Sequence, residues 1–323
     1  MKMTLRMSLM CGLAACAAPV SAQVIYNNGP LSTGATTTSG VAAPAGTTWS
    51  EVQDDGSTTC SNTVAGFSCG IVGASLFRVA DDFTVPAGQS WTINRICIYA
   101  YQTGSLTSTP VFTAANIQIW NGRPGDAGAS VIFGDTTTNR LASQAFDNMW
   151  RVFNTQTPAP GTAPGTTRGI RKLELTVGTT LAAGTYWIDW QTSIGGASAH
   201  FHPCTTFSEM RGMPGANARQ FTTLWVDMAD TGNPANCGAS PVLQESTFQV
   251  KGTIQGGGPT CYANFDNSTI VPFLNVNDFV AFNNAFAAGL TTANCDLSTI
   301  VPVLNVNDFI CFNNLFAAGC SAP

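Results

Sequence analysis

Residues 266–289 read DNSTIVPFLNVNDFVAFNNAFAAG, and residues 296–319 read DLSTIVPVLNVNDFICFNNLFAAG. The second stretch repeats the first at a constant offset of 30 residues, which indicates an internal duplication. Each copy consists of a polar loop followed by a stretch with helical periodicity. The C-terminal part of the chain is therefore predicted to be a small α-helical domain built from two loop–helix units.

The helix in each copy is marked by phenylalanines at helical spacing and by residues suited to its two ends. The six phenylalanines are Phe279, Phe282, Phe286, Phe309, Phe312 and Phe316. Asn275 and Asn305 stand at N-cap positions, and Gly289 and Gly319 follow the last helical turn. Because one helix of this length is marginal in water, we expect the two to pack through their phenylalanine faces.

Both loops carry the oxygen donors that calcium prefers, namely carboxylates, amides and hydroxyls. The candidate ligands are Asp266, Ser268, Asn275 and Asp278 in the first copy, and Asp296, Ser298, Asn305 and Asp308 in the second. Each loop has only two carboxylates, which predicts weak calcium binding. The alternative interpretation is that Asp278 and Asp308 only stabilise the helix N-termini electrostatically.

The tandem repeat resembles the dockerin family, whose domain consists of two calcium-binding loop–helix units. The similarity rests on residues 294–296, NCD, and residues 304–312, LNVNDFICF, a pattern typical of variant dockerins that end secreted bacterial proteins. It implies a docking or anchoring module without catalysis, held by a protein or a cell-envelope partner. The loops depart from the family pattern because Ile270 and Val271 replace the usual polar residue and glycine at the fifth and sixth places.

The cysteines of the repeat suggest one disulfide. Cys295 and Cys311 in the second copy correspond to Phe265 and Ala281 in the first, so both thiols are absent together from the first copy. This joint absence favours a Cys295–Cys311 bond, although four cysteines allow three pairings. The other predicted pairs are Cys261–Cys320, Cys60–Cys69 and Cys204–Cys237. Cys97 lies in a strand-like run and is predicted to be a buried free thiol.

Residues 1–22 have the features of a secretory signal peptide. Lys2 and Arg6 precede an apolar run that ends in the small residues VSA at 20–22. Residues 13–16, LAAC, also fit a lipobox, in which case Cys16 would be lipidated. Either leader predicts export, to the extracellular space or cell surface or to the periplasm, where disulfides can form.

The composition limits the partners of the chain. Charged residues make up 10% of the 323 residues, against a usual value of about 25%. The formal net charge is −5, and no basic patch is evident. Nucleic acid and anionic membranes are therefore poor partners, and no stretch after the leader reaches transmembrane length.

Residues 23–254 are predicted to form an all-β domain, a jelly-roll-like antiparallel sandwich of two sheets. The predicted strands are rich in β-branched and aromatic residues and are separated by Gly, Pro and Asn. They span residues 77–85, 90–101, 116–120, 149–153, 171–177, 184–191, 199–202, 222–226 and 247–254. Residues 29–59 have few core residues and are expected to be loosely ordered. A glycine-rich linker, 255–260, leads to the repeat domain, 261–323.

The body resembles a group of secreted bacterial proteins of unassigned role. The shared phrases include residues 24–29, VIYNNG, residues 80–85, ADDFTV, and residues 183–192, AGTYWIDWQT. This resemblance implies a surface or extracellular protein, and it implies no reaction.

Two groups in the body are candidates for binding chemistry. Asp189 lies between Trp187 and Trp190, and a carboxylate beside indole rings suits a sugar, so these residues are candidate polysaccharide ligands. His200 and His202 point to the same side of a strand, but no third metal ligand is spaced to join them, so a partly exposed histidine pair is predicted instead.

The sequence contains no local motif for catalysis. A glycoside hydrolase would need two paired carboxylates, and no motif nominates such a pair. The predicted function is a secreted non-catalytic protein docked through a calcium-binding tail. The alternative is a carbohydrate-binding module, or a carbohydrate-active enzyme such as a glycoside hydrolase, assembled through the same tail.

Overall fold

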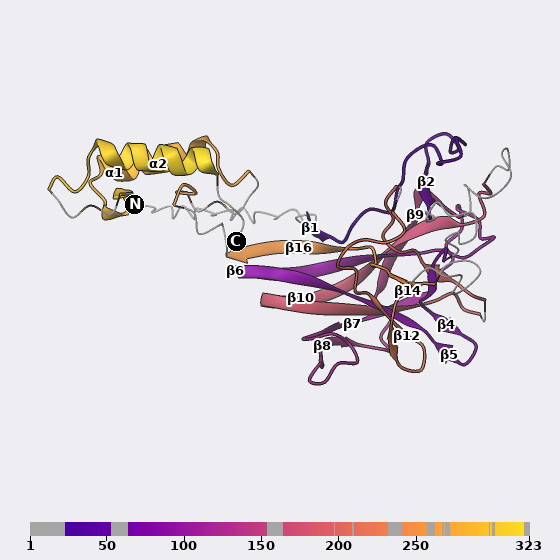
Figure 1. Cartoon of the computed structure of the whole chain (residues 1–323). Coiled ribbons are helices and arrows are strands. Elements are labelled where there is room, and N and C mark those ends of the chain that lie inside the picture. Colours follow the sequence, from indigo (N-terminus) through magenta and orange to yellow (C-terminus); the bar gives the residue numbers. More distant parts are fainter. Residues whose placement is uncertain are drawn as a thin grey trace, which may run out of the picture.

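The computed structural model describes residues 23–52, 64–153, 164–196, 198–208, 210–231, 241–256, 262–266, 268, 272–296, 298 and 301–319. These residues form a β-sheet body and a C-terminal pair of helices (Figure 1). The predicted signal peptide, residues 1–22, lies outside them. The last strand runs to Gly256, so the first two residues of the predicted linker belong to the body.

Two long antiparallel strands organise the body. β6 (Arg78–Ala100) and β10 (Gly169–Ser193) pair from Arg171↔Ala100 to Trp190↔Val79. The sequence predicted two shorter strands in each place, because residues 86–89 and 178–184 contain the Gly and Pro of turns. The structure instead accommodates these residues as irregularities in a continuous ribbon, with register shifts at Thr176/Thr179 and Ala182/Gly184.

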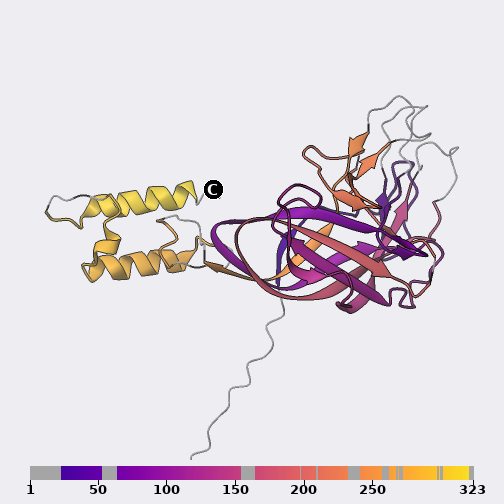
Figure 2. The same cartoon turned by 90° about the horizontal axis from the view of Figure 1, so that it is seen from below.

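Each half of this ribbon carries further strands (Figures 1 and 2). The half near Ala100 is extended by β16 (Phe248–Gly256), β1 (Gln23–Asn27), β9 (Leu141–Val152) and the parallel strand β2 (Thr48–Glu51). The half near Arg78 is extended by β7 (Ala114–Trp120), β8 (Val131–Asp135), β12 (Arg219–Phe221) and β13 (Trp225–Asp227). All these strands therefore belong to one hydrogen-bonded network.

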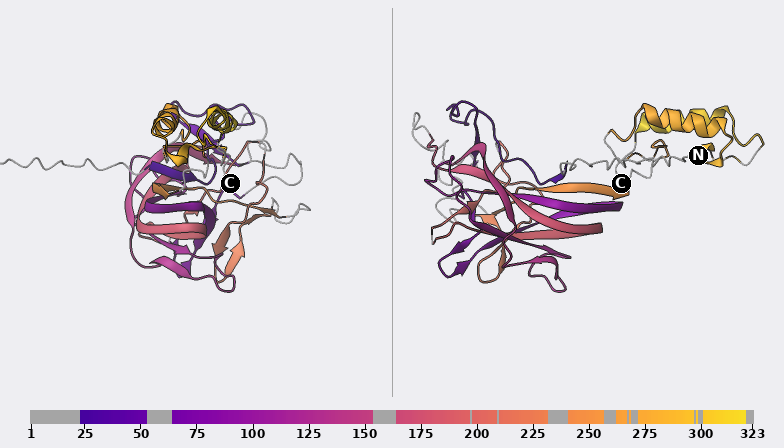
Figure 3. Two further views of the ribbon diagram at one scale, coloured as in Figure 1. Left: turned by 90° about the vertical axis from the view of Figure 1, so that its left-hand side faces the viewer. Right: turned by 180° about the vertical axis from the view of Figure 1, so that it is seen from behind.

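Among the described residues, three two-stranded pieces accompany this network. The pairs are β3 (Phe67–Ser68) with β11 (Phe201–His202), β4 (Ile71–Val72) with β5 (Ser75–Leu76), and β14 (Ala229–Asp230) with β15 (Val242–Leu243). In Figure 3 the strands of the body curl around a common interior. Ile96, Ile98, Leu173, Trp190 and Phe248 are fully buried there in one cluster. The prediction of an all-β body is confirmed, and its layers are consistent with a sandwich.

The N-terminal segment of the body is more ordered than predicted. Residues 29–52 contain β2, and Trp49 is only 1% exposed. The Trp49 indole donates to the Val41 carbonyl at 3.0 Å, and the Glu51 carboxylate accepts from the Thr38 backbone N–H at 2.9 Å. The expectation of loose order is wrong for these residues because the buried side chains of Leu31, Trp49 and Val52 anchor them. Residues 53–59 lie outside the described ones.

The tail contains α1 (Val276–Ala287), the short 3-10 helix η1 (Thr291–Ala293) and α2 (Val306–Ala318). The phenylalanines pair across an approximate two-fold axis. Phe279 contacts Phe316 at 4.4 Å between ring centroids, Phe286 contacts Phe309 at 4.5 Å, and Phe282 stacks on Phe312 at 4.3 Å. The two helices are therefore antiparallel and lie side by side (Figure 3), as the repeat predicted. Neither has the length and apolar character needed to span a bilayer.

The cysteines confirm part of the predicted pairing. Cys295 and Cys311 form a disulfide, and Cys97 is a buried free thiol. Cys69 and Cys204 are also buried and free, so the predicted pairs Cys60–Cys69 and Cys204–Cys237 are wrong. The physical reason is that both thiols lie in the hydrophobic core, where Cys69 Sγ is 3.4 Å from the Thr192 hydroxyl. The remaining partners, and the pair Cys261–Cys320, lie outside the described residues.

Candidate functional site

The carboxylates that begin the two helices close the tail loops. Asp278 Oδ2 accepts from the Asn275 N–H at 2.8 Å, and its Oδ1 accepts from the Asp266 N–H at 3.2 Å. In the second copy, Asp308 Oδ2 accepts from the Asn305 N–H at 2.7 Å, and its Oδ1 accepts from the Cys295 N–H at 2.8 Å. Both carboxylates are fully buried, and each completes a capping box. These hydrogen bonds hold each loop against the start of its helix.

The other predicted ligands divide into two groups. Asp266 Oδ1 accepts from the Ser268 N–H at 2.8 Å, and Asp296 repeats this with Ser298 at 2.9 Å, so these residues lie together inside each loop. The Asn275 side-chain oxygen instead accepts from the Asn277 N–H at 2.9 Å, as an N-cap does, and Asn305 does the same with Asn307. The Asn275 and Asn305 amide oxygens are thus committed to the helices.

The structure adds one residue to each loop that the sequence analysis did not nominate. Asn264 donates to the Ser268 carbonyl at 3.0 Å, and Asn294 donates to the Ser298 carbonyl at 2.9 Å. The Oδ1 atom of each is buried without a hydrogen-bond partner in the described structure, and Asn264 is only 5% exposed. The signal was present in the sequence, because an Asn stands two residues before the first Asp in both copies.

A buried amide oxygen without a donor is costly, and the same cost occurs at matched positions of both loops. A hard cation would satisfy such an oxygen together with carboxylate and carbonyl oxygens. Within the described residues, no three His, Cys, Asp or Glu side chains converge, so each loop combines two carboxylates with neutral donors. These donors therefore fit a calcium ion, with two carboxylates in each loop to balance its charge.

The candidate sugar-binding residues of the body are in different surroundings from those predicted. Asp189 is fully buried, forms an ion pair with Arg78, and accepts the indole N–H of Trp120. Burial raises the pKa of Asp189, and the Arg78 charge opposes that rise. Trp190 lies in the core, and Trp187 is 5% exposed with the Arg123 guanidinium 5.7 Å from its ring centre. The prediction of a sugar site here is wrong, because the Asp189 carboxylate is already bound to Arg78 and Trp120 and the rings of Trp187 and Trp190 are covered.

The two histidines are structural rather than partly exposed. His200 and His202 are both fully buried. His200 Nε2 lies 3.2 Å from the Thr192 carbonyl, and His202 Nδ1 lies 3.0 Å from the Tyr99 carbonyl. Burial lowers the pKa of His202 to about 3, so its ring is neutral at ordinary pH. Through these contacts His200 connects its segment to the backbone of β10, and His202 connects its segment to the backbone of β6.

A second buried acid joins β6 to the segment before β16. Asp81 is fully buried and accepts from the Ser246 N–H at 2.7 Å and from the Asn28 amide at 3.0 Å. The same Asn28 amide donates to Glu245 at 3.1 Å. Burial raises the pKa of Asp81, and the neighbouring Glu245 raises it further. Burial also raises the pKa of Glu245.

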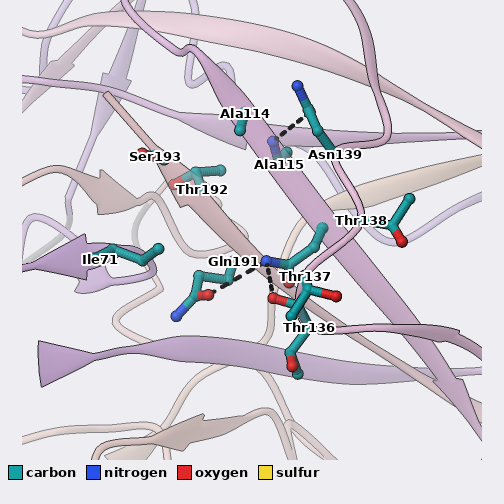
Figure 4. Close-up of a pocket in the computed structure, with 11 residues that line it drawn as sticks. Ile71, Ala114, Ala115, Thr136, Thr137, Thr138, Asn139, Gln191, Thr192 and Ser193 are labelled. Carbon is teal, nitrogen blue, oxygen red and sulfur yellow. Dashed lines mark hydrogen bonds between the residues drawn. The ribbon is translucent and has the colours of Figure 1, made fainter. Parts of the chain in front are cut away.

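The body has a groove on the outer side of β7 and β10, made of two adjoining cavities of about 340 and 380 Å³. They share the walls Ile71, Thr136, Thr137 and Gln191. Figure 4 shows the first cavity, with Gln191 between Ile71 and the turn at residues 136–138. The second cavity continues to an aromatic end formed by Trp120, Phe221 and Trp225.

The floor of the groove is a closed polar network. Asn116 accepts from Arg78 at 2.6 Å, and it donates to the Thr136 carbonyl at 2.8 Å and to Gln191 at 3.3 Å. Gln191 donates to the Phe77 carbonyl at 3.2 Å. The positive charge of Arg78 is balanced by Asp189 beneath it, so the floor is rigid and has no net charge.

Asp135 holds the turn at residues 136–138, which forms one wall of the groove. Asp135 Oδ1 accepts from the Thr138 N–H at 2.6 Å and the Thr137 N–H at 2.8 Å, and its carboxylate also binds both threonine hydroxyls. These hydrogen bonds, the one from Thr138 first, hold the pKa of Asp135 well below its usual range. The turn at residues 136–138 is therefore fixed against the groove.

Comparison with family models, with curated proteins and with solved structures returns no match for this chain. The function is therefore inferred from the sites alone.

Proposed function

We propose that the protein is an exported, non-catalytic β protein that is held at a surface or partner by a calcium-stabilised, dockerin-like tail. The observation that carries the proposal is the matched pair of buried, unpartnered amide oxygens of Asn264 and Asn294, one in each loop. In this proposal each cation is held by Asn264, Asp266 and Asp278 in the first loop, and by Asn294, Asp296 and Asp308 in the second. Calcium would link the loop to the helix and supply structural stability.

The outer surfaces of the helices support docking as the role of this domain. Val276 and Val280 on α1 are 70% and 53% exposed, and their counterparts Val306 and Ile310 on α2 are 67% and 53% exposed. These pairs are spaced by four residues, so each helix presents a two-residue apolar ridge to solvent. Matched ridges on both helices suit contact with a protein surface.

Calcium binding is tested on the full-length mature protein. Hydrogen exchange of residues 262–319 is measured with added calcium and with a chelator. We expect calcium to protect the loops and the first turns of α1 and α2, and we expect the double variant Asn264→Ala/Asn294→Ala to lose that protection. The double variant Asn283→Ala/Asn313→Ala, at exposed helix positions, is the matched control. Equal exchange with calcium and chelator in the wild-type protein refutes the metal part of the proposal.

Docking is tested by comparing the mature protein with a variant that ends at Gly256. Both are added to envelope preparations of the source cells, and the retained fraction is measured. We expect retention of the whole protein, and we expect the variants Val276→Asp and Val306→Asp to weaken it while the fold is kept. Equal retention of the truncated protein would place the attachment in the body and contradict the proposal.

A further inference from the structure

We infer that the groove formed by the two adjoining cavities on β7 and β10 is a binding site for a neutral oligosaccharide. Trp120 and Trp225 form its aromatic wall, and Gln118 and Thr136 supply polar contacts. The site differs from the buried Trp187–Asp189–Trp190 group that the sequence nominated. It lies wholly in the body and does not depend on calcium or on the tail.

The shape of the groove suits an extended small ligand. Each cavity, about 340 and 380 Å³, lies within the range of about 300–1,000 Å³ that is usual for small-molecule pockets. Because the two cavities share four wall residues, they offer adjacent places along one path. Such a path fits consecutive units of a chain better than a single compact molecule.

The aromatic end is held in a fixed orientation. The indole N–H of Trp120 is bound to the buried Asp189, so its ring cannot rotate freely. Trp225 meets Trp120 edge to face at 6.5 Å between centroids, and it meets Phe221 at 5.5 Å. All three rings are partly exposed. A pyranose has faces of C–H groups that pack on aromatic rings, while its hydroxyls stay at the edge, so rigid half-exposed rings suit it.

Two polar side chains of the wall are available for a ligand. The amide of Gln118, which lies between Asn116 and Trp120 on one side of β7, makes no side-chain hydrogen bond to another described residue. The Thr136 hydroxyl likewise has no hydrogen-bond partner among the described residues. The one hydrogen bond of Thr136 from a side chain there is to its backbone carbonyl, which accepts from the Asn116 amide. Amides and hydroxyls can both donate and accept, which matches the hydroxyl groups of a sugar.

The charge of the groove selects a neutral ligand. Arg78 is the one charged residue among the described residues that line it, and Asp189 neutralises that charge. An acidic sugar would therefore find no free cation there. Hydrolysis would need two carboxylates across the bond to be cleaved, and the described lining holds no Asp or Glu. The geometry therefore supports binding without cleavage.

The test uses the full-length mature protein and two sets of defined oligosaccharides. One set contains neutral gluco-, xylo-, manno- and galacto-oligosaccharides, and the other contains uronic acid oligosaccharides. Binding is measured by isothermal titration after an array screen, and the site is located by hydrogen exchange. We expect a neutral set member to bind and to protect residues 114–120 and 219–227.

Three variants and a control test the named residues. Trp225→Ala removes one platform and should weaken binding about tenfold, whereas Trp225→Phe should weaken it less. Gln118→Ala should weaken binding about three- to tenfold, because it removes one hydrogen-bonding group. Leu224→Ala, on the same turn but 73% exposed and outside the groove, should bind as the wild type does.

The outcomes are decisive in both directions. Binding of a neutral oligosaccharide that Trp225→Ala and Gln118→Ala both weaken supports the site. The inference is overturned if no oligosaccharide binds, if only the uronic acid set binds, or if both variants bind as tightly as the wild type. Unfolding temperatures of the variants show whether a loss of binding is local, and Gln118→Ala keeps the test valid if Trp225→Ala fails to fold.

Discussion

The body and the tail stabilise themselves in different ways. The body has a large core whose residues come from strands far apart in the sequence. It also contains buried ionisable side chains, among them Asp81, Arg78 and Asp189. The tail has a small core with five buried apolar residues among those described, and it depends on phenylalanine stacking, two capping boxes and a disulfide. A small domain needs such local supports because its hydrophobic core alone is marginal. The two regions should therefore respond to different substitutions.

The largest effect in the tail is expected from Phe282→Ala. Phe282 is fully buried and stacks on Phe312 at the centre of the helix pair. Losing a buried phenylalanine costs about 3–5 kcal/mol, which a domain of this size cannot absorb. Hydrogen exchange should show residues 262–319 unfolded and the body unchanged. Loss of protection in β6 or β10 as well would contradict the separation of the two regions.

The matching effect in the body is expected from Asp189→Ala. This variant leaves Arg78 buried without its carboxylate and removes the partner of the Trp120 indole. Breaking one partner of a buried pair costs about 3–5 kcal/mol. The unfolding transition of the body, followed by tryptophan fluorescence, should move to lower denaturant. All seven tryptophans precede residue 226, so this signal reports on the body alone. The paired variant Asp189→Leu/Arg78→Met should recover part of the loss.

Removing the disulfide should have an intermediate effect on the tail. Cys295 and Cys311 close a loop with a sequence separation of 16. Closing a loop of this length stabilises a domain by about 3 kcal/mol through the unfolded state. Cys295→Ser/Cys311→Ser should therefore lower the melting temperature of the tail and leave that of the body alone. If melting is unchanged, the helix pair is already sufficient without the bond.

A smaller effect is expected from the helix caps. Asn275→Ala removes the side-chain acceptor of the Asn277 N–H and should destabilise α1 by about 1 kcal/mol. Asn305→Ala should do the same to α2. A larger loss that appears only in calcium would show that the capping asparagine also binds the cation, which the structure does not indicate.

The pH dependence of the body should be the smallest effect. The pKa values of Asp81 and Glu245 are raised in the folded state, mainly by burial. Folding therefore retains protons on these groups, and their contribution to stability is full at acid pH and falls as pH rises through the folded pKa values. Glu245→Gln should flatten the decline in melting temperature that is expected as pH rises through these raised pKa values. A decline as steep as in the wild type would exclude this pair as its cause.

Several features of the fold could be predicted from sequence. The strands of β6, β7, β10 and β16 follow from dense Val, Ile and aromatic runs, and the all-β class follows from their number. The continuity of β6 through residues 86–89 could not be predicted, because a Pro-Ala-Gly-Gln segment is typical of a turn. The structure accommodates it as an irregularity between Val85 and Ser90, which still pair with Gly184 and Ala182 of β10. The order around Trp49 was missed for the same reason: its contacts are to other segments.

The candidate sites divide in the same way. The tail loops were located from the repeat, although Asn264 and Asn294 became evident only when their amide oxygens were seen buried and unpartnered. The groove of the body could not have been located, since its residues come from seven strands, namely β4, β5, β6, β7, β10, β12 and β13, and from the turn after β8. Trp187, Asp189 and Trp190 are adjacent in sequence, yet strand alternation places Trp190 in the core and other segments cover Trp187.

The sequence by itself determined the duplicated tail, its capped helices and its phenylalanine interface, because these depend on local spacing that repeats after 30 residues. It also indicated the Cys295–Cys311 bond, because the first copy lacks both cysteines together. Only the tertiary structure decided which acids are buried, that Cys69 and Cys204 are free, and where the groove lies. These properties depend on which distant strands become neighbours. That choice is made by the packing of the whole core, and no short stretch of sequence contains it.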